Sequence, residues 1–337
     1  MRDVLNIDDR KDEVSSGIRS LYYRARRSFI SDLLAWVRCR SLSLPNVSQL
    51  AEATMRVSDP AEEEGSGESP IFVLSTGWRS GSTLLQRILV TDPRLILWGE
   101  PLGDVALIPG IAETVSRMSK VIKLRENYIS DNVTPRSMPT TWIALLYPPG
   151  EDFRLALRGF FDRWLGSPAR QRGFVRWGLK EVRLSATEAA FLHWLYPNAK
   201  FLMISRHPYD GYRSLCDATW RRVYYRCPDI SVHSAAAFAR HWNRLALSWS
   251  ELPPEFPLFH IKYEELIDDG IDFRRLETWL GVEIREAAAL SASVGATARS
   301  RLSWHERWII RSIARRGMQA LGYPPGNKHA ERPRLPS

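Results

Sequence analysis

The sequence predicts an α/β fold with three layers, in which helices cover both faces of a central, mainly parallel sheet. The chain has 337 residues and 44% of them are hydrophobic, which suffices for one large α/β domain or two small ones with a core. Apolar stretches of strand length alternate with segments of helical period. The first of these strands leads into a turn rich in Gly, Ser and Thr that is typical of a phosphate-binding loop.

The charge balance favours an anionic ligand. The 47 basic residues exceed the 38 acidic residues and give a net charge of +9, which suits nucleotides, sulfated or phosphorylated substrates, nucleic acid or an acidic membrane surface. Three cysteines are too few and too scattered for a disulfide framework, no CxxC pair predicts zinc, and we expect no metal ion. Because we see no signal sequence and no apolar run of about 20 residues, we expect a soluble, cytoplasmic protein.

The N-terminal region, residues 1–58, is predicted to be a helical extension. Apolar side chains recur with helical period over residues 18–37, and the arginines between them give this amphipathic helix a basic face. Two interpretations stay open: the helix packs on the main domain, or it contacts a membrane surface or a protein partner. By composition, residues 59–70 form an acidic linker, 71–323 the main domain and 324–337 a C-terminal tail.

The turn after the first strand is the feature around which the chain is organised. Apolar residues Ile71 to Leu74 lead into this turn, which opens a helix. Small residues let backbone N–H groups point into one concavity, and the helix N-terminus adds partial positive charge. The spacing departs from the ATP and GTP motif, because three residues instead of four separate Gly77 from Gly81, and Arg79 lies inside the loop.

A second strand is predicted over residues 95–98, LILW, and it completes a β-α-β unit. Glu100 follows this strand, and since ligands bind beside the carboxyl ends of parallel strands, we expect Glu100 on the same edge as the cradle. From 102 to about 172 the pattern weakens to helices and proline-broken loops. Within this segment, the aromatic-rich stretch MPTTWIALLYPPGEDF, residues 138–153, either lines an acceptor pocket or packs in the core.

Two further strands carry charged residues at or after their ends. Residues 174–182 are predicted to form a strand that ends near Lys180, and Ser185 with Glu188 makes the capping box of the next helix. Residues 200–205, KFLMIS, predict a buried strand that leads into Arg206 and a helix running to about Cys216. The later elements are expected to be a helix over 234–250, a strand over 258–262, and helices over 273–280 and 304–321.

Three motifs resemble those of the sulfotransferases that use 3'-phosphoadenylyl sulfate (PAPS). They are STGWRSGSTLL, SRHPYDGYRSL, and IKYEELIDD followed by FRRLETWLGV. The resemblance covers residues 71–323 and is closer to the bacterial carbohydrate-type and tyrosyl-type members than to the cytosolic type with a histidine base. It implies a three-layer fold with a P-loop-like phosphosulfate cradle, PAPS as co-substrate, adenosine 3',5'-bisphosphate as product, and no metal.

The resemblance also implies where the nucleotide binds. The residues of the phosphosulfate loop are Trp78, Arg79, Ser80, Gly81, Ser82 and Thr83. Arg206 and Ser214, eight residues apart, match the pair that holds the 3'-phosphate, and Tyr263 matches the residue that contacts adenine. Arg299 and Arg301, within TARSRLSW, match a late basic loop that closes over the nucleotide.

Sulfuryl transfer needs stabilisation of the negative charge that builds on the departing phosphate oxygen, and it needs a base for the acceptor. Arg79 and Lys180 are the candidates for stabilising this charge, and a salt bridge with Glu181 or another carboxylate is the structural alternative for Lys180. Some family members use a histidine two residues after the strand lysine, where this chain has Val182. The resemblance implies Glu100 as the base, because many carbohydrate-type and tyrosyl-type members place a Glu just after the second strand, as GEPL does here. A salt bridge to Arg79 or a helix cap is its structural alternative. His207 is a reserve candidate.

The sequence thus predicts a sulfotransferase that acts on an acceptor hydroxyl of a small molecule or carbohydrate. Sugar, small natural product, lipid-linked carrier and phenol are all open, and no nucleic acid is expected as a partner. Two alternatives stay open. One is a nucleotide-dependent kinase of the P-loop type, which the missing Gly-Lys-Ser/Thr string disfavours. The other is a non-catalytic basic scaffold bound to a membrane or to nucleic acid.

Overall fold

The computed structural model describes residues 46–57, 69–118, 125–218, 226–227, 230–232, 234–268, 270–285 and 301–324. They belong to two compact units. The described parts of 43–206 and 245–297 form the first, which we call the sheet unit, and those of 207–244 and 298–337 form the second, which we call the helical unit. The predicted amphipathic helix over 18–37, nearly all of the acidic linker and nearly all of the C-terminal tail lie outside the described residues.

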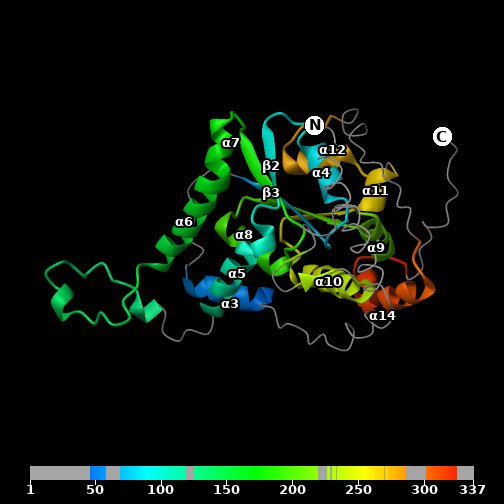
Figure 1. Ribbon diagram of the computed structural model, residues 1–337. Helices are drawn as coiled ribbons and strands as arrows, with labels where there is room; N and C mark the ends of the chain where they lie inside the picture. The colour runs from blue at the N-terminus through cyan, green and yellow to red at the C-terminus, as the bar shows by residue number, and fades with distance from the viewer. Residues whose placement is uncertain are drawn as a thin grey trace, which may run out of the picture. The chain divides into compact units, whose positions relative to one another are not determined.

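The sheet unit is built on five parallel strands in the order β2-β3-β1-β4-β7 (Figure 1). These strands are β1 (Ile71–Ser75), β2 (Leu95–Gly99), β3 (Arg176–Lys180), β4 (Lys200–Ser205) and β7 (Leu258–Lys262). The expected parallel sheet is confirmed, but β1 and β2 are not neighbours, because β3 pairs with both of them. The carboxyl ends of β1, β2, β3 and β4 therefore share one edge of the sheet.

Alternate residues of each strand face opposite layers of helices. On one face, β-strand residues such as Ile71, Val73 and Leu202 share a buried cluster with α4 (Ser82–Leu89) and α12 (Phe273–Leu280). On the other face, the ring of Phe72 lies 6.2 Å from that of Tyr196, which follows α8 (Ala186–Leu195), and 5.1 Å from that of Phe201. Helices therefore cover both faces of the sheet, which confirms the predicted three-layer arrangement.

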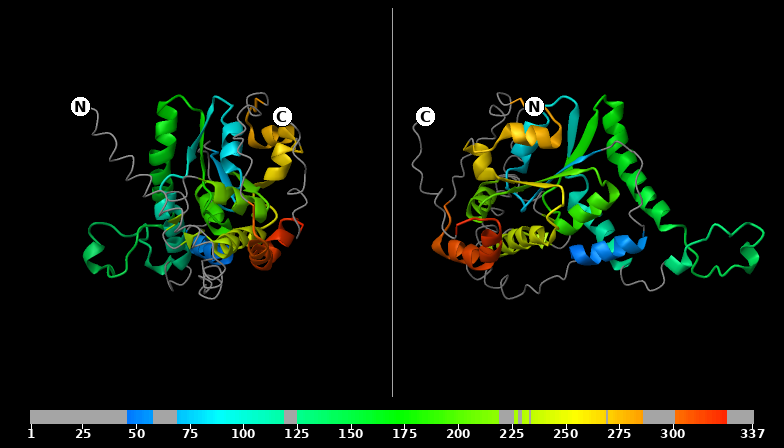
Figure 2. Two further views of the ribbon diagram at one scale, coloured as in Figure 1. Left: turned by 45° about the vertical axis from the view of Figure 1, so that its right-hand side comes forward. Right: turned by 180° about the vertical axis from the view of Figure 1, so that it is seen from behind.

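Further helices of the sheet unit extend the second helical layer. They are α3 (Val47–Val57), α5 (Leu107–Arg117), α6 (Gly150–Phe161), a π-helical turn (Asp162–Gly166), α7 (Ser167–Gln171) and α11 (Tyr263–Ile267), which instead follows β7. Short 3-10 turns lie at Gly103–Val105, Arg125–Asn127, Met138–Thr140 and Trp249–Glu251. Helix α3 contacts α5, α6 and α8. Helices α5, α6 and α8 are seen beside α3 in Figure 1 and again from behind in Figure 2.

The helical unit contains α9 (Pro208–Asp217), α14 (Trp304–Ala320), most of α10 (Ala235–Ser248) and a pair of antiparallel two-residue strands, β5 (Arg226–Cys227) and β6 (Ile230–Ser231). Helix α14 contacts α9, and the amide of Gly317 donates to Oδ1 of Asn243 at 2.8 Å. The ring of Tyr212 packs against that of Phe238 at 5.4 Å. Within the described ranges, every helix is too short or too polar to cross a bilayer.

The aromatic-rich stretch over residues 138–153 does not pack in the core. Trp142 is 71% exposed and Ile143 is 62% exposed, and residues 126–149 include no buried position. The core-packing interpretation of this stretch is therefore wrong, because its apolar side chains do not pack into the core of the sheet unit. Its use as an acceptor pocket stays a prediction.

Candidate active site

The loop between β1 and α4, which we call the cradle, has an unusual backbone. Its residues Gly77, Arg79 and Gly81 have φ angles of 117°, 66° and 93°. The Ser75 hydroxyl accepts from the amide of Gly77 at 3.2 Å and lies 3.0 Å from the Gly77 carbonyl oxygen, and the amide of Thr76 donates to the carbonyl of Ile204 at 3.1 Å. Alternating left-handed residues give a concave loop, and these hydrogen bonds fix that loop to the central strands.

Two buried hydroxyls in the cradle have no hydrogen-bond partner among the described residues. They are Oγ1 of Thr76 and Oγ of Ser80, whose residues are 0% and 3% exposed. Buried polar atoms in native structures are nearly always paired. The N-cap residue of α4, Gly81, supplies no side-chain cap, and the first turn of α4 has no acidic residue. The cradle therefore fits an oxyanion such as a phosphate or sulfate group, which would accept from these donors.

Four of the predicted nucleotide-binding residues meet at the cradle. The guanidinium carbon of Arg206, which follows β4, lies 4.1 Å from the ring centroid of Tyr263 on α11. The same guanidinium donates to the carbonyl oxygen of Arg79 at 3.3 Å. At Gly81, a Cβ atom would lie 2.2 Å from the Tyr263 ring, so only glycine leaves room for this aromatic side chain. The resulting surface combines a cation, an aromatic ring and the cradle.

The other predicted residues belong to the helical unit or lie outside the described residues. Ser214 is buried on α9, Arg301 is exposed just before α14, and Arg299 falls in the undescribed stretch 286–300. Their roles stay predictions.

His207, the reserve candidate for a base, is buried: its Nδ1 accepts from the amide of Tyr209 at 3.3 Å, and its Nε2 lies 3.2 Å from the carbonyl of Pro324. These contacts make His207 the N-cap of α9.

A cluster of charges, which we call the edge cluster, lies where β2 and β3 end. Glu100 has a positive φ of 48°, and its amide donates to the carbonyl of Lys180 at 2.7 Å. One carboxylate oxygen of Glu100 pairs with the Lys180 ammonium, and the other accepts from Arg183 at 2.9 Å. The salt-bridge alternative for Lys180 is thus confirmed, with Glu100 as its partner. The alternative partner expected for Glu100, Arg79, is not among its ion pairs in the described structure.

Arg183 was missing from the set of predicted residues, and Glu181 was expected only as a partner for Lys180, whereas it pairs with Arg183. Arg183 is buried, and its Nη1 donates to Glu181 at 2.8 Å as well as to Glu100. Its guanidinium carbon also lies 5.4 Å from the ring centroid of Trp78, so it links the edge cluster to the cradle. Burial raises the pKa of the Glu181 carboxyl, and the adjacent Arg183 guanidinium opposes this rise. The sequence signal was KEVR, with three charged residues at and just after the end of a buried strand.

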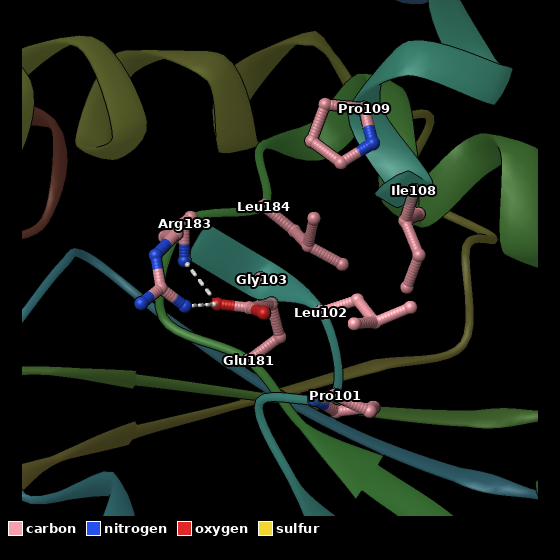
Figure 3. Close-up of a pocket in the computed structure, with 8 residues that line it drawn as sticks. All are labelled: Pro101, Leu102, Gly103, Ile108, Pro109, Glu181, Arg183 and Leu184. Atoms are coloured by element: carbon pink, nitrogen blue, oxygen red, sulfur yellow. Dashed lines mark hydrogen bonds and ion pairs between the residues drawn. The ribbon is translucent and has the colours of Figure 1, made fainter. Parts of the chain in front are cut away.

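A small pocket adjoins the edge cluster (Figure 3). Its lining residues are Pro101, Leu102, Gly103, Ile108, Pro109, Glu181, Arg183 and Leu184. Figure 3 shows Leu102, Ile108 and Leu184 on one side and the hydrogen-bonded Arg183 and Glu181 on the other. A Cβ atom at Gly103 would lie 2.1 Å from Glu181 Oε2 and 2.3 Å from Arg183 Nη1, so a side chain there would displace this ion pair. In the part of the chain that the structure describes, no group of His, Cys, Asp and Glu side chains could hold a metal ion.

Comparisons with known proteins bear on this arrangement. The family model described as "Sulfotransferase family" matches residues 70–286, well over half of the chain. Among solved structures, a sulfotransferase from Alicyclobacillus acidocaldarius is 15% identical, with a TM-score of 0.39 over 76% of this chain and 94% of that one. The sulfotransferase domain from the curacin biosynthetic pathway is 15% identical, with a TM-score of 0.42 over 76% and 98%. A sulfotransferase from Mycobacterium avium is 18% identical, with a TM-score of 0.40 over 82% and 85%. No curated protein is significantly similar in sequence.

Proposed function

Because this chain belongs to the sulfotransferase family, we propose that it transfers a sulfuryl group from PAPS to an acceptor hydroxyl. The observation that carries the proposal is the pair of buried hydroxyls, of Thr76 and Ser80, that lack partners among the described residues. They lie at the same edge of the sheet as the ion pair of Glu100 and Lys180. Oxyanion donors and a carboxylate that can receive a proton thus share one edge of the sheet.

We assign nucleotide binding to the residues that the sequence predicted. The cradle residues 78–83 would hold the phosphosulfate end, and Tyr263 and Arg206 would contact adenine and the 3'-phosphate. Ser214, Arg299 and Arg301 are assigned to the nucleotide on the resemblance alone. When bound, PAPS supplies an electrophilic sulfuryl group on a phosphate leaving group. Arginine suits this ligand, because its planar guanidinium pairs with phosphate through two hydrogen bonds.

We assign the general base to Glu100 and charge stabilisation to Lys180 and Arg79. Each carboxylate oxygen has two lone pairs, so an oxygen that accepts from Lys180 or Arg183 can still accept a proton. The Lys180 ammonium has three donors and uses one of them on Glu100, which leaves donors for a developing charge. Arg183 is a positioning residue in this scheme, because it holds the second oxygen of Glu100 and stacks on Trp78.

Calorimetric titration with adenosine 3',5'-bisphosphate tests the nucleotide assignment. We expect binding of this compound and at least tenfold weaker binding of ATP with Mg²⁺, which would exclude the kinase alternative. Arg206→Ala should weaken binding about tenfold or more, because a charge-assisted contact is lost. Its matched control is Arg275→Ala, whose guanidinium stacks on Phe259 at 5.5 Å in the same unit. Equal affinity of the Arg206 variant for the bisphosphate, or preferential ATP binding, would contradict the assignment.

Turnover is tested with labelled PAPS and a panel of phenols, sugars and alcohols. We expect release of adenosine 3',5'-bisphosphate to depend on the acceptor and to need no added metal. Salt-sensitive binding to lipid vesicles or oligonucleotides without any turnover would favour the scaffold alternative.

A further inference from the structure

One segment of the sheet unit projects from it and carries apolar side chains into solvent. Residues 129–149, which we call the apolar arm, leave the sheet unit and return to it at one place. There the amide of Ile129 donates to the carbonyl of Tyr147 at 2.8 Å, and the amide of Tyr147 donates to the carbonyl of Asn127 at 2.8 Å. Figures 1 and 2 show the arm extending away from the base of α6 in all three views. Its most exposed apolar residues are Trp142, Ile143 and Leu145, the last at 51%.

Helix α6, which follows the arm, turns an apolar face outward as well. Phe153, Leu157, Phe160 and Trp164, the α6 stripe, follow one another at helical spacing across α6 and the π-helical turn. Phe153 and Phe160 are exposed, whereas the arginines Arg154 and Arg158 are buried on the same helix. Arg154 donates to the carbonyl of Trp194 at 3.1 Å. The helix therefore docks through Arg154, Arg158 and Phe161 and leaves Phe153 and Phe160 exposed.

The chemistry of these two surfaces indicates a protein partner. The exposed apolar side chains of the arm and of α6 present roughly 700–800 Å² together, close to the ~800 Å² that each partner buries in a standard interface. Within the arm only Asp131 and Arg136 are charged, so the arm has no net charge. Peripheral membrane surfaces typically add clustered Lys and Arg to their apolar face, whereas interface cores are rich in Trp, Phe, Tyr and Met and poor in charge.

We propose that the apolar arm lies on the α6 stripe of a second copy of this chain, in a two-fold symmetric dimer. Trp142 and Ile143 of the arm and Phe153 and Phe160 of the stripe are all exposed within one chain, so the arm does not cover its own stripe. In a two-fold dimer the arm of each chain contacts the stripe of the other. The single two-fold rotation that relates the chains therefore covers both apolar surfaces of both chains. The inference does not depend on sulfuryl transfer.

Sedimentation velocity of the full chain at about 10 μM tests the proposal. The wild-type chain should sediment as a dimer, and Trp142→Asp and Phe160→Asp should each raise the dimer dissociation constant at least 100-fold. Trp304→Asp is the matched control, because Trp304 on α14 is 79% exposed but lies outside both surfaces. This variant should remain dimeric. If either aspartate variant misfolds by circular dichroism, Ile143→Asn and Phe153→Ser replace the pair.

Mixing the two monomeric variants identifies the contact. A mixed dimer joins the intact arm of the Phe160→Asp chain to the intact stripe of the Trp142→Asp chain, so dimers should reappear in the mixture and in neither variant alone. A monomeric wild-type chain at 100 μM would overturn the proposal, as would a wild-type dimer that survives both substitutions. Flotation of the wild-type monomer with phosphatidylcholine vesicles would overturn it in favour of a membrane surface.

Discussion

Glu100 is held in a backbone conformation that residues with a side chain rarely adopt. Its φ is 48°, and Arg79, Leu102 and Ala106 also have positive φ. All the non-glycine residues with positive φ in the described ranges lie in the cradle or within seven residues after β2. Each such residue costs about 1–3 kcal/mol and persists only where its surroundings determine it. Here the Lys180 carbonyl, the Lys180 ammonium and Arg183 fix Glu100.

Glu100→Gln tests the base at the residue scale. The amide keeps the shape of the carboxylate but cannot take up a proton, so we expect the kcat of sulfuryl transfer to fall at least 100-fold. The affinity for adenosine 3',5'-bisphosphate should stay within about threefold. Glu113→Gln, in an exposed pair with Arg117, is the control and should keep full activity. Normal turnover by the Glu100 variant would show that another group is the base.

Substitution of Arg183 separates positioning from stability. Arg183→Lys keeps the charge but cannot contact Glu100, Glu181 and Trp78 together, so kcat should fall about 10- to 100-fold. Arg183→Met removes the cation that pairs with the buried Glu181 carboxylate. This variant should lower the free energy of unfolding by about 3 kcal/mol. Activity is compared per folded molecule, with urea unfolding as the second measurement. Equal kcat for the folded wild-type chain and the folded Arg183→Lys variant would reduce Arg183 to a structural role.

At the scale of elements, Asp92 joins the end of α4 to β2 and to the segment after α12. Its carboxylate accepts from the amide and the guanidinium of Arg94, at 2.9 Å and 2.7 Å, and from the amide of Glu283 at 3.0 Å. Hydrogen bonds from the Arg94 side chain hold the pKa of Asp92 well below its usual value of 3.8. A carboxylate with several charge-assisted partners stabilises the folded chain as long as it is ionised.

Asp92→Asn should lower the free energy of unfolding by about 2–3 kcal/mol at pH 7. A depressed pKa means that the stabilisation is complete above the pKa of the unfolded chain and is lost as the pH falls toward the folded value. The difference in the free energy of unfolding between wild type and variant should therefore be constant above about pH 5 and shrink below about pH 4. Urea unfolding across this range measures it, with Glu52→Gln on an exposed face of α3 as control. A difference that does not change with pH would mean that the carboxylate charge contributes nothing.

Local signals predicted individual elements well. The strands over 200–205 and 258–262 and the helix over 273–280 have the bounds expected from the sequence, because apolar runs, Asp272 and Gly281 mark their ends locally. The capping box of Ser185 and Glu188 is also confirmed. The insertion of β3 between β1 and β2 was not predictable, because strand order depends on contacts between distant segments.

The candidate site was predicted in part for the same reason. Strand ends located Glu100, Lys180 and Arg206 at one edge, since a parallel sheet aligns its carboxyl ends. Arg183 was not predicted, because its role comes from three contacts made together, with Glu100, Glu181 and Trp78. No spacing in the sequence indicates that these residues meet. The core-packing alternative for the stretch around Trp142 failed for a related reason: apolarity predicts that a residue is covered, but not whether its own chain covers it.

At the scale of the whole molecule, hydrogen exchange should map the nucleotide to one edge of the sheet unit. With saturating adenosine 3',5'-bisphosphate, we expect the largest protection in peptides that cover residues 75–89, 178–184 and 261–267. Peptides from α3 and α6 should change little, because these helices lie away from the cradle (Figure 1). ATP with Mg²⁺ is the control ligand. Protection centred on α3 or α6 would place the nucleotide elsewhere.

The central position of β1 has a consequence for synthesis on the ribosome. Ile71 pairs with Gly178 on one side and with Lys200 on the other, so β1 is made long before either neighbour. At ~5–20 residues per second, the nascent strand waits on the order of ten seconds with both backbone edges unpaired. The amide of Thr76 finds its acceptor, Ile204, only at the end of that wait. The cradle is thus translated well before the strands that give it its shape.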